Sequence, residues 1–365
     1  MTSSAPRAVI LGLSRKDVIT ISLAAIISVA AGILSAISAG PVFTFVVSAA
    51  ALALLATVVG SATENLGNRL GPGATGVLQA ALGNLPELFV CIFALRAGLV
   101  KVVQAALVGS ILANSLLVLG LAILVGGLRH GPQRFPAQAP RITATLMLLA
   151  TAALAVPTLA FELHTPASAH IGALDIACAI VLLAVFASSI PFLLKGDPTV
   201  CSDRTPDDEQ PESWPLTVAI GILAIAGVGA GLVSDWFVEA LKPTIATLHL
   251  SETFTGLVIV AIAGNAVENV VGITLAARNK MDYAVSVILT SSLQIALALI
   301  PVLVLLSYVI GGAHLTLVLA PLLVVALTFS ALLNAFIVYD GESIWLEGAA
   351  LIGLYGIVAA SFWWG

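Results

Sequence analysis

The chain has 365 residues, of which 60% are hydrophobic and 9% are charged, and its formal net charge is −5. A soluble domain carries about 25% charged residues, so this composition excludes a water-soluble globule and predicts an integral membrane protein. Apolar stretches of about 20 residues recur along the whole length, which predicts an all-α polytopic protein rather than a barrel of strands about 10 residues long.

Eleven apolar stretches are long enough to cross a membrane, so we expect about 11 transmembrane helices. They occupy residues 17–37, 40–60, 74–96, 102–127, 141–162, 170–194, 215–234, 252–277, 283–308, 313–338 and 345–364. With a cytoplasmic N-terminus, eleven of the fourteen Lys and Arg residues fall in cytoplasmic segments, as the positive-inside rule requires. We therefore expect a multi-pass protein of a bacterial-type cell (inner) membrane, with the C-terminus outside.

One long polar segment divides the stretches into six and five. Residues 196–214 carry six acidic side chains against a single Arg, and we expect them to form a cytoplasmic loop. Similar motifs in the third and eighth stretches indicate a repeat of five helices, and an odd number inverts the second copy in the membrane. The predicted organisation is an N-terminal tail with one extra transmembrane helix (1–39), a first five-helix repeat (40–195), the acidic loop (196–214) and a second, inverted five-helix repeat (215–365).

The two motifs read Gly-Asn-Leu-Pro-Glu at 83–87 and Gly-Asn-Ala-Val-Glu at 264–268. A charged side chain in the middle of a membrane helix costs about 2.5–3.5 kcal/mol on insertion scales, so such residues usually serve a function. Gly and Pro favour a local helix break, which exposes carbonyl oxygens that can bind a cation. We interpret Glu87 and Glu268 as two halves of one cation site. The alternative is that each is a neutral, hydrogen-bonded acid in a helix contact.

The stretches that follow each motif supply a second matched layer. Asn114 comes 30 residues after Asn84, and Gln294 comes 29 residues after Asn265. Hydroxyl groups accompany the two amides, with Ser110 and Ser291 as candidates. Hard divalent cations prefer such oxygen ligands together with carboxylates, although polar side chains also hold membrane helices together.

Other acids are weaker candidates because they lie near predicted helix ends, where side chains are usually solvated. Glu64 and Glu239 could line a cation pathway, and Asp175 lies near the outer end of the sixth stretch.

No hydrolase, dinucleotide-binding or Walker motif is present in the sequence, and no predicted loop is long enough for an ATPase domain. We therefore expect a transporter driven by an ion gradient and not an enzyme. A carboxyl group in the membrane can hold either a metal ion or a proton, and this competition couples two flows. A passive cation channel is the alternative from another class.

Three segments of the chain match a known family. They are GSATENLGNRLGPGATGVLQAALGNLPEL at 60–88, SETFTGLVIVAIAGNAVEN at 251–269 and DGESIWLEGAALIGLYGIVAASFWW at 340–364. They resemble the calcium/proton exchangers of the calcium/cation antiporter superfamily, and the resemblance covers most of the chain from about residue 55. Related sodium/calcium exchangers usually have Gly-Thr-Ser where this chain has Gly-Asn, which favours the proton-coupled branch.

The resemblance implies a secondary active antiporter that exchanges cytoplasmic Ca²⁺ for H⁺ by alternating access, with the stretches at 40–60 and 215–234 as the moving pair. It implies Glu87 and Glu268 as the shared carriers of both ions. The implied neighbours in that site are Asn84, Asn265, Asn114, Gln294, Ser110 and Ser291. Expected partners are the two ions and the lipid bilayer, with Ca²⁺ as substrate, no cofactor and no nucleic acid. A Na⁺/H⁺ or Na⁺/Ca²⁺ exchanger on the same scaffold is the alternative.

Overall fold

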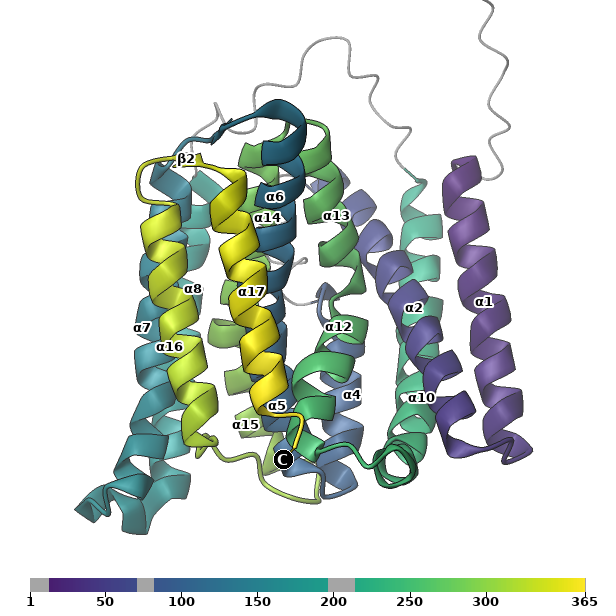
Figure 1. Ribbon diagram of the computed structural model, residues 1–365. Helices are drawn as coiled ribbons and strands as arrows, with labels where there is room; N and C mark the ends of the chain where they lie inside the picture. The colour runs from purple at the N-terminus through teal and green to yellow at the C-terminus, as the bar shows by residue number, and fades with distance from the viewer. Residues whose placement is uncertain (1–12, 71–81, 196–213, 365) are drawn as a thin grey trace, which may run out of the picture. The chain divides into compact units, whose positions relative to one another are not determined.

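The computed structural model describes residues 13–70, 82–195 and 214–364, without the side chains of residues 68–70, 191–195, 267 and 268. This part of the chain is almost entirely helical (Figure 1), which confirms the predicted all-α membrane fold. Seven of its helices are long and apolar enough to span a membrane, or eight if the bent pair 252–264 and 269–277 is one span. Two shorter apolar helices lie near the C-terminus, and each of the eleven predicted stretches contains at least one helix.

The first half of the chain contains α1 (Arg15–Ala36), α2 (Pro41–Leu70), α4 (Leu85–Arg96), α5 (Val100–Leu112), η1 (Ala113–Val118), α6 (Leu119–His130), β1 (Gln133–Arg134), α7 (Gln138–Glu162), η2 (Pro166–His170) and α8 (Ile171–Lys195). The second half contains α10 (Leu216–Leu248), α11 (Glu252–Phe254), η3 (Thr255–Val260), α12 (Ala261–Gly264), α13 (Ala266–Ala277), α14 (Met281–Gln294), η4 (Ile295–Leu299), α15 (Ile300–Ser307), α16 (Pro321–Ile337), β2 (Glu342–Ser343) and α17 (Trp345–Ser361). Elements η1, η3 and η4 are π-helical turns, whose backbone hydrogen bonds span one residue more than those of an α-helix.

The lengths of three predicted stretches were wrong. Helices α2 and α10 continue well beyond residues 60 and 234, so Glu64 and Glu239 lie within helices rather than at their ends. The helix in the tenth predicted stretch, α16, begins at Pro321 instead of residue 313. Residues 313–320 are apolar but irregular, because side chains of other helices satisfy their backbone polar groups in place of helical hydrogen bonds.

Two pairs of elements that occupy matching places in the predicted repeats run in opposite directions. Near the start of α5, Gln104 donates a hydrogen bond to the carbonyl of Thr316, just beyond the end of α15 (2.7 Å). At the end of α6, His130 Nε2 lies 3.1 Å from the carbonyl of Ala277, just before α14 begins. The rod formed by α5, η1 and α6 is therefore antiparallel to the rod formed by α14, η4 and α15 (Figure 1).

Helices α7 and α16 repeat this relation. Thr158, near the end of α7, donates to the carbonyl of Leu317 ahead of α16 (3.0 Å). Arg141, near the start of α7, donates to the carbonyl of Tyr339 beyond the end of α16 and stacks on its ring. Opposite directions in matching helices are what an inverted repeat requires.

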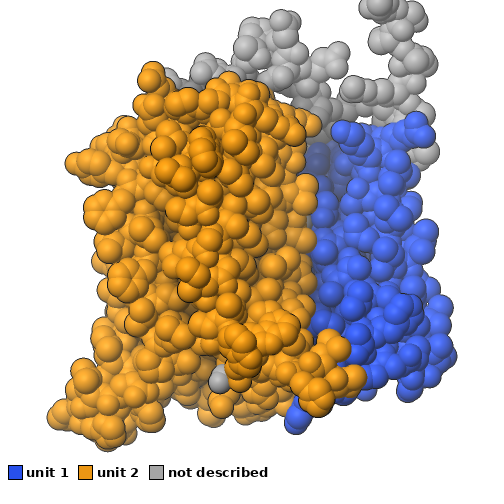
Figure 2. Space-filling view, in the orientation of Figure 1, with its two compact units in different colours: residues 1–90, 188–244 blue, residues 91–187, 245–365 orange. Residues whose placement is uncertain are grey.

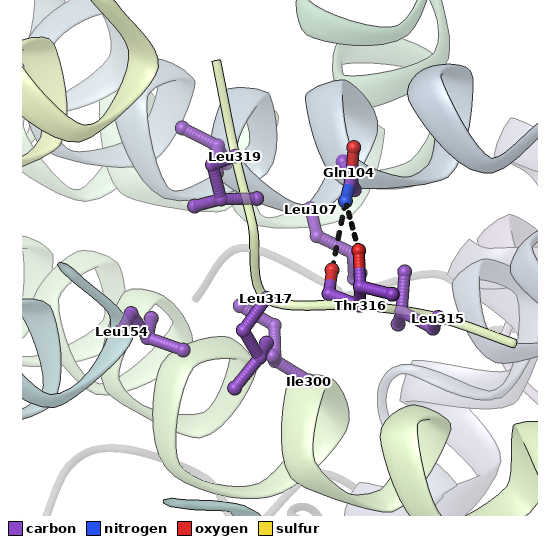
Figure 3. Close-up of a pocket in the computed structure, with 9 residues that line it drawn as sticks. Gln104, Leu107, Leu154, Ile300, Leu315, Thr316, Leu317 and Leu319 are labelled. Atoms are coloured by element: carbon purple, nitrogen blue, oxygen red, sulfur yellow. Dashed lines mark hydrogen bonds between the residues drawn. The ribbon is translucent and has the colours of Figure 1, made fainter. Parts of the chain in front are cut away.

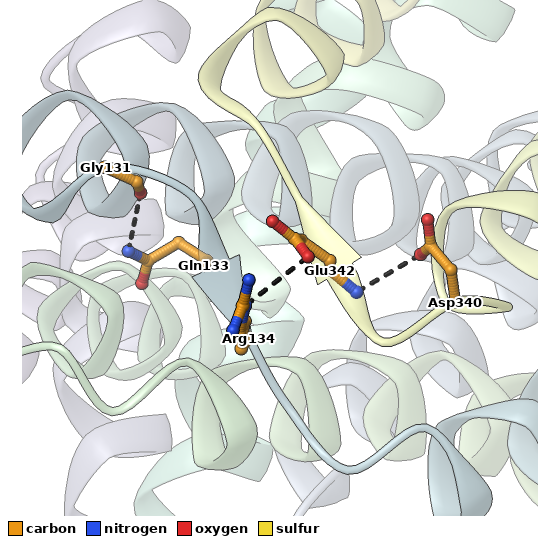
Figure 4. A network of polar contacts seen from close by, with 5 residues as sticks. All are labelled: Gly131, Gln133, Arg134, Asp340 and Glu342. Atoms are coloured by element: carbon orange, nitrogen blue, oxygen red, sulfur yellow. Dashed lines mark hydrogen bonds and ion pairs between the residues drawn. The ribbon is translucent and has the colours of Figure 1, made fainter.

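A short antiparallel ladder joins the loop after α6 to the loop before α17. Strand β1 pairs with β2 in the register Gln133 to Ser343 and Arg134 to Glu342. Figure 4 shows the ion pair between Arg134 Nε and Glu342 Oε2 (3.4 Å), and Gln133 Nε2 donating to the carbonyl of Gly131 (3.0 Å). Their pairing shows that the two loops lie at the same end of the helices, and the sequence predicts that this end is cytoplasmic.

The chain divides into two compact units, coloured separately in Figure 2. The first consists of residues 1–90 and 188–244, and the second of residues 91–187 and 245–365. Each unit takes segments from both predicted repeats. The first unit holds α1, α2 and most of α10, and in its interior the rings of Phe45 and Phe237 stack with their centroids 4.7 Å apart.

Trp214 fastens the three helices of the first unit together. Its indole donates to Asp17 Oδ2 on α1 (3.1 Å), and its backbone N–H donates to Asn65 Oδ1 on α2 (3.1 Å). The ring packs in an apolar cluster with Leu13, Ala62 and Ala219. One residue just before α10 therefore binds both α1 and α2, so α1 is tied to the other two helices.

The substitution Trp214→Phe is expected to lower the stability of the detergent-solubilised protein by about 1 kcal/mol, because it removes one hydrogen bond and keeps most of the apolar contact. The measurement is thermal unfolding followed by size-exclusion chromatography. Trp364→Phe is the matched control, because Trp364 is 84% exposed. Equal unfolding temperatures for the two variants would show that the bond to Asp17 does not hold α1 in place.

Candidate cation site

A buried network of amides and hydroxyls crosses from one predicted repeat to the other within the second unit. Asn114 Nδ2 donates to Asn265 Oδ1 (3.3 Å) and to Ser291 Oγ (3.1 Å). Asn265 Nδ2 donates to Ser110 Oγ (2.8 Å) and to the carbonyl of Ala261 (2.9 Å). All four polar side chains of this network are buried. Four residues that the sequence singled out therefore meet at one place.

Small residues let the helices that carry the network approach closely. A Cβ atom on Gly109 of α5 would overlap the carbonyl oxygen of Leu257, and one on Gly256 of η3 would overlap that of Val102. Only glycine permits such a backbone-to-backbone contact, as is common where membrane helices cross. The crossing places α5 against η3 and α12, so that Ser110 reaches Asn265.

The helix breaks at the second Gly-Asn motif. Helix α12 ends at Gly264, α13 begins at Ala266, and the two parts of this span are bent by 62°. In the first motif, α4 begins directly after Asn84. Asn84 and Asn265 each accept a backbone hydrogen bond four residues on, from Leu88 (2.9 Å) and Asn269 (3.1 Å). Both motifs thus start a short helix in the same way.

The two acids occupy equivalent positions in these short helices. Glu87 is the third residue of α4, and Glu268 is the third residue of α13. The first turn of a helix favours a negative charge through its free N–H groups. Glu87 is only 4% exposed. The side chain of Glu268 lies outside the described residues.

The rods that complete the layer each contain a π-helical turn. Asn114 lies within η1, and Gln294 directly precedes η4. Such turns are rare and often found at functional sites, because they redirect side chains without ending the helix. Within the described part of the chain, no hydrogen bond joins Gln294 to the network.

Two amide oxygens near the network lack hydrogen-bond donors among the described residues. These are Oδ1 of Asn114, whose side chain is fully buried, and Oδ1 of Asn269. A buried acceptor without a partner costs about 1–3 kcal/mol, and oxygen atoms of this kind are ligands for hard cations. The Asn114 oxygen therefore fits a cation-binding role.

Two further features of this region lie outside the set of candidate ligands. Ser115 Oγ lies 3.3 Å from Ser292 Oγ, and both side chains are buried. Asn269 follows directly after Glu268 and was not selected as a ligand. In each case the available signal was a polar residue next to a selected one. Glu64 and Glu239 are exposed side chains on α2 and α10 in the first unit.

No group of three or more His, Cys, Asp or Glu side chains that could hold a metal is found among the described residues. In this region the oxygens come mainly from amides and hydroxyls. Such a donor set suits a hard cation better than zinc or copper.

Comparison with known proteins gives consistent similarities. The model of the family described as sodium/calcium exchanger protein matches residues 40–195 and 218–364. A Ca²⁺/H⁺ antiporter of Aphanothece halophytica is 36% identical over 338 residues, covering 87% of this chain and 89% of that protein. The Ca²⁺/H⁺ antiporter ChaA of Bacillus subtilis is 35% identical over 322 residues, covering 87% and 91%. The solved structure of native YfkE superposes with a TM-score of 0.79 at 32% identity, covering 95% of this chain and 99% of that one.

Proposed function

The chain belongs to the sodium/calcium exchanger protein family, and on that premise we propose that it exchanges Ca²⁺ for H⁺ across a membrane as a secondary active antiporter. The similar proteins of Aphanothece halophytica and Bacillus subtilis are named Ca²⁺/H⁺ antiporters. The observation that carries the proposal is the buried network in which Asn114 of one repeat bonds Asn265 of the other, with the Asn114 amide oxygen left without a donor among the described residues. Asn265 of this network precedes Glu268 by three residues in the sequence.

In this proposal Glu87 and Glu268 are the groups that carry either ion. Two ionised carboxylates balance the charge of one Ca²⁺, which takes six to eight oxygen ligands. The further oxygens come from the amides and hydroxyls of Asn84, Asn265, Asn114, Gln294, Ser110 and Ser291. Carbonyl oxygens at the end of α12 face the same helix break and can add to them.

Protons compete with the metal for the same carboxylate oxygens. Ca²⁺ binds when both acids are ionised, and protons that arrive from the acidic side neutralise the acids and release the metal. No covalent step is needed, provided that the site opens to one side at a time. Helices α2 and α10, the first of each repeat, are the proposed moving pair, and the described structure groups both in the first unit. Trp214 makes α1 part of the same group.

The proposed organisation keeps residues 1–39 as tail and extra helix, with the repeats at 40–195 and 215–365. The N-terminus and the acidic loop at 196–214 lie in the cytoplasm and the C-terminus outside, so that cytoplasmic Ca²⁺ leaves in exchange for external H⁺. The loop falls outside the described residues except for Trp214. Glu64 and Glu239 are exposed on their helices, where they can attract cations on entry or exit.

The test is uptake of radioactive calcium into liposomes that contain the purified protein and carry an imposed pH gradient. We expect uptake against a calcium gradient, because only proton-coupled exchange supplies the energy. The control is the same liposomes without a pH gradient. Uptake that requires a sodium gradient instead would indicate a sodium-coupled exchanger, and flux that only follows the calcium gradient would indicate a channel. Either result would contradict the proposed function.

A further inference from the structure

A second buried acid lies in the second unit, outside the Gly-Asn motifs. Asp175, in the first turns of α8, is 0% exposed, and neither of its carboxyl oxygens accepts a well-formed hydrogen bond from the described residues. It is the only Asp among the buried residues of the described chain. The cation site proposed above does not use it.

The acid lies beside the irregular segment 313–320. The backbone N–H of Leu317 points at its carboxyl group as a weak hydrogen-bond donor. One turn further along α8, Cys178 contacts the carbonyl of Ala153 on α7 (3.8 Å), and α7 in turn bonds to the segment through Thr158. Asp175 therefore belongs to a packed arrangement of α7, α8 and this segment.

Side chains of the surrounding helices form hydrogen bonds with at least one backbone polar group of each residue from 315 to 319 of the segment. Gln104 donates to the carbonyls of Thr316 and Val318, as Figure 3 shows for Thr316. Thr158 donates to the carbonyl of Leu317 and accepts from the N–H of Leu319 (2.9 Å). The N–H of Leu315 donates to Ser307 Oγ (3.1 Å). The N–H of Leu317 lies midway along the chain between the N–H groups of Leu315 and Leu319. It is the backbone group directed at Asp175.

The surroundings of Asp175 supply no positive charge. No Lys, Arg or His among the described residues forms an ion pair with it. The α7 residues from Ala150 to Thr158 have no titratable side chain. Among the described side chains of α8 and of segment 313–320, the other titratable groups are Cys178 and His314. The ring of His314 stacks on Tyr308. An ionised carboxylate can only accept hydrogen bonds, and one weak hydrogen bond from a backbone N–H does not offset the burial of a charge that has no positive partner.

We propose that Asp175 is a proton-binding site separate from the two glutamates, and that its bound proton keeps segment 313–320 packed against α8. When the proton leaves for water, the carboxylate becomes a buried charge without a positive partner, and the packing of the segment loosens to let water reach it. The ligand is a proton rather than a metal ion, because a hard cation needs several oxygen ligands and no cluster of acids surrounds Asp175 in the described chain. The proposal does not depend on which ions the protein transports.

The experiment is infrared spectroscopy of the purified full-length protein in lipid at neutral pH. We expect a carbonyl stretching band of a protonated carboxylic acid that Asp175→Asn removes. Cys178→Ser is the matched control and is expected to keep the band, because it changes a titratable neighbour on the same helix and leaves the acid. A spectrum in which Asp175→Asn removes no such band would overturn the proposal.

Two further measurements keep the test decisive. Wild-type protein with ¹³C in the aspartate carboxyl groups should shift the same band, which assigns it without a substitution and separates it from the glutamates. Hydrogen–deuterium exchange of the peptide 313–320, relative to peptides of α14, should rise with pH in the wild type and stay constant in Asp175→Asn. An unshifted band, or equal pH dependence of exchange in both proteins, contradicts the proposed proton site.

Discussion

Membrane vesicles that contain Glu87→Gln or Glu268→Gln are expected to lose proton-driven calcium uptake by about 100-fold or more. Removing one partner of a buried pair of opposite charges, here a carboxylate and the bound cation, typically costs about 2–5 kcal/mol, and each 1.4 kcal/mol changes an affinity by about tenfold. Glutamine keeps the size and one carbonyl oxygen of the side chain but can neither carry the negative charge nor bind a proton. Both variants should therefore fail in metal binding and in proton coupling together.

The control for these variants is Glu162→Gln, at the exposed end of α7. It should transport calcium like the wild type, because its charge lies in solvent. Protein amount and monodispersity in detergent must match among the variants, so that a loss of flux is not a loss of protein. Normal uptake by either Glu87→Gln or Glu268→Gln would remove that acid from the site and with it the two-carboxylate mechanism.

The substitution Gly109→Ala is expected to destabilise the folded protein by about 3 kcal/mol, at the upper end of the usual range for overpacking. The added methyl group meets the backbone of Leu257, and a backbone cannot move aside as a flexible side chain does. Separation of α5 from η3 would also pull Ser110 away from Asn265. The measurement is the unfolding temperature in detergent, together with calcium uptake.

Gly353→Ala in α17 is the matched control, because a Cβ atom there meets no atom within 4 Å. Alanine in an open helix position should leave stability unchanged or raise it by about 0.5–1 kcal/mol. If both variants unfold at the same temperature, the close crossing at Gly109 does not exist in the membrane.

The helical architecture could be predicted because long apolar runs leave few other structures in lipid. The ends of the helices could not. The run at 313–320 is as apolar as a helix, yet Gln104 and Thr158, more than 150 residues away, satisfy its backbone. A contact at that separation leaves no pattern in the local sequence.

In the candidate site, too, some features could be predicted from the sequence and others could not. The family resemblance implies Asn114 and Asn265 as neighbours, and a hydrogen bond joins them in the structure, while their part in a cation site stays a prediction. The partners of Glu87 and Glu268 stay predictions, as does the place of Gln294 in the layer. The pairing of Ser115 with Ser292 could not be predicted, because it depends on how each rod is rotated about its axis.

The π-helical turn η1 changes the rotation of α6 about the rod axis relative to α5. Gly120 and Gly127 follow Gly109 by 11 and 18 residues, which are about three and five complete turns of an ideal α-helix. In an uninterrupted rod all three glycines would form one stripe. The wider turn between them offsets the stripe, so Gly109 faces η3, whereas Gly120 and Gly127 face α17. A single helix can thereby dock two neighbours on different sides, and deleting one residue of η1 would realign the glycines and leave one of those neighbours without its groove.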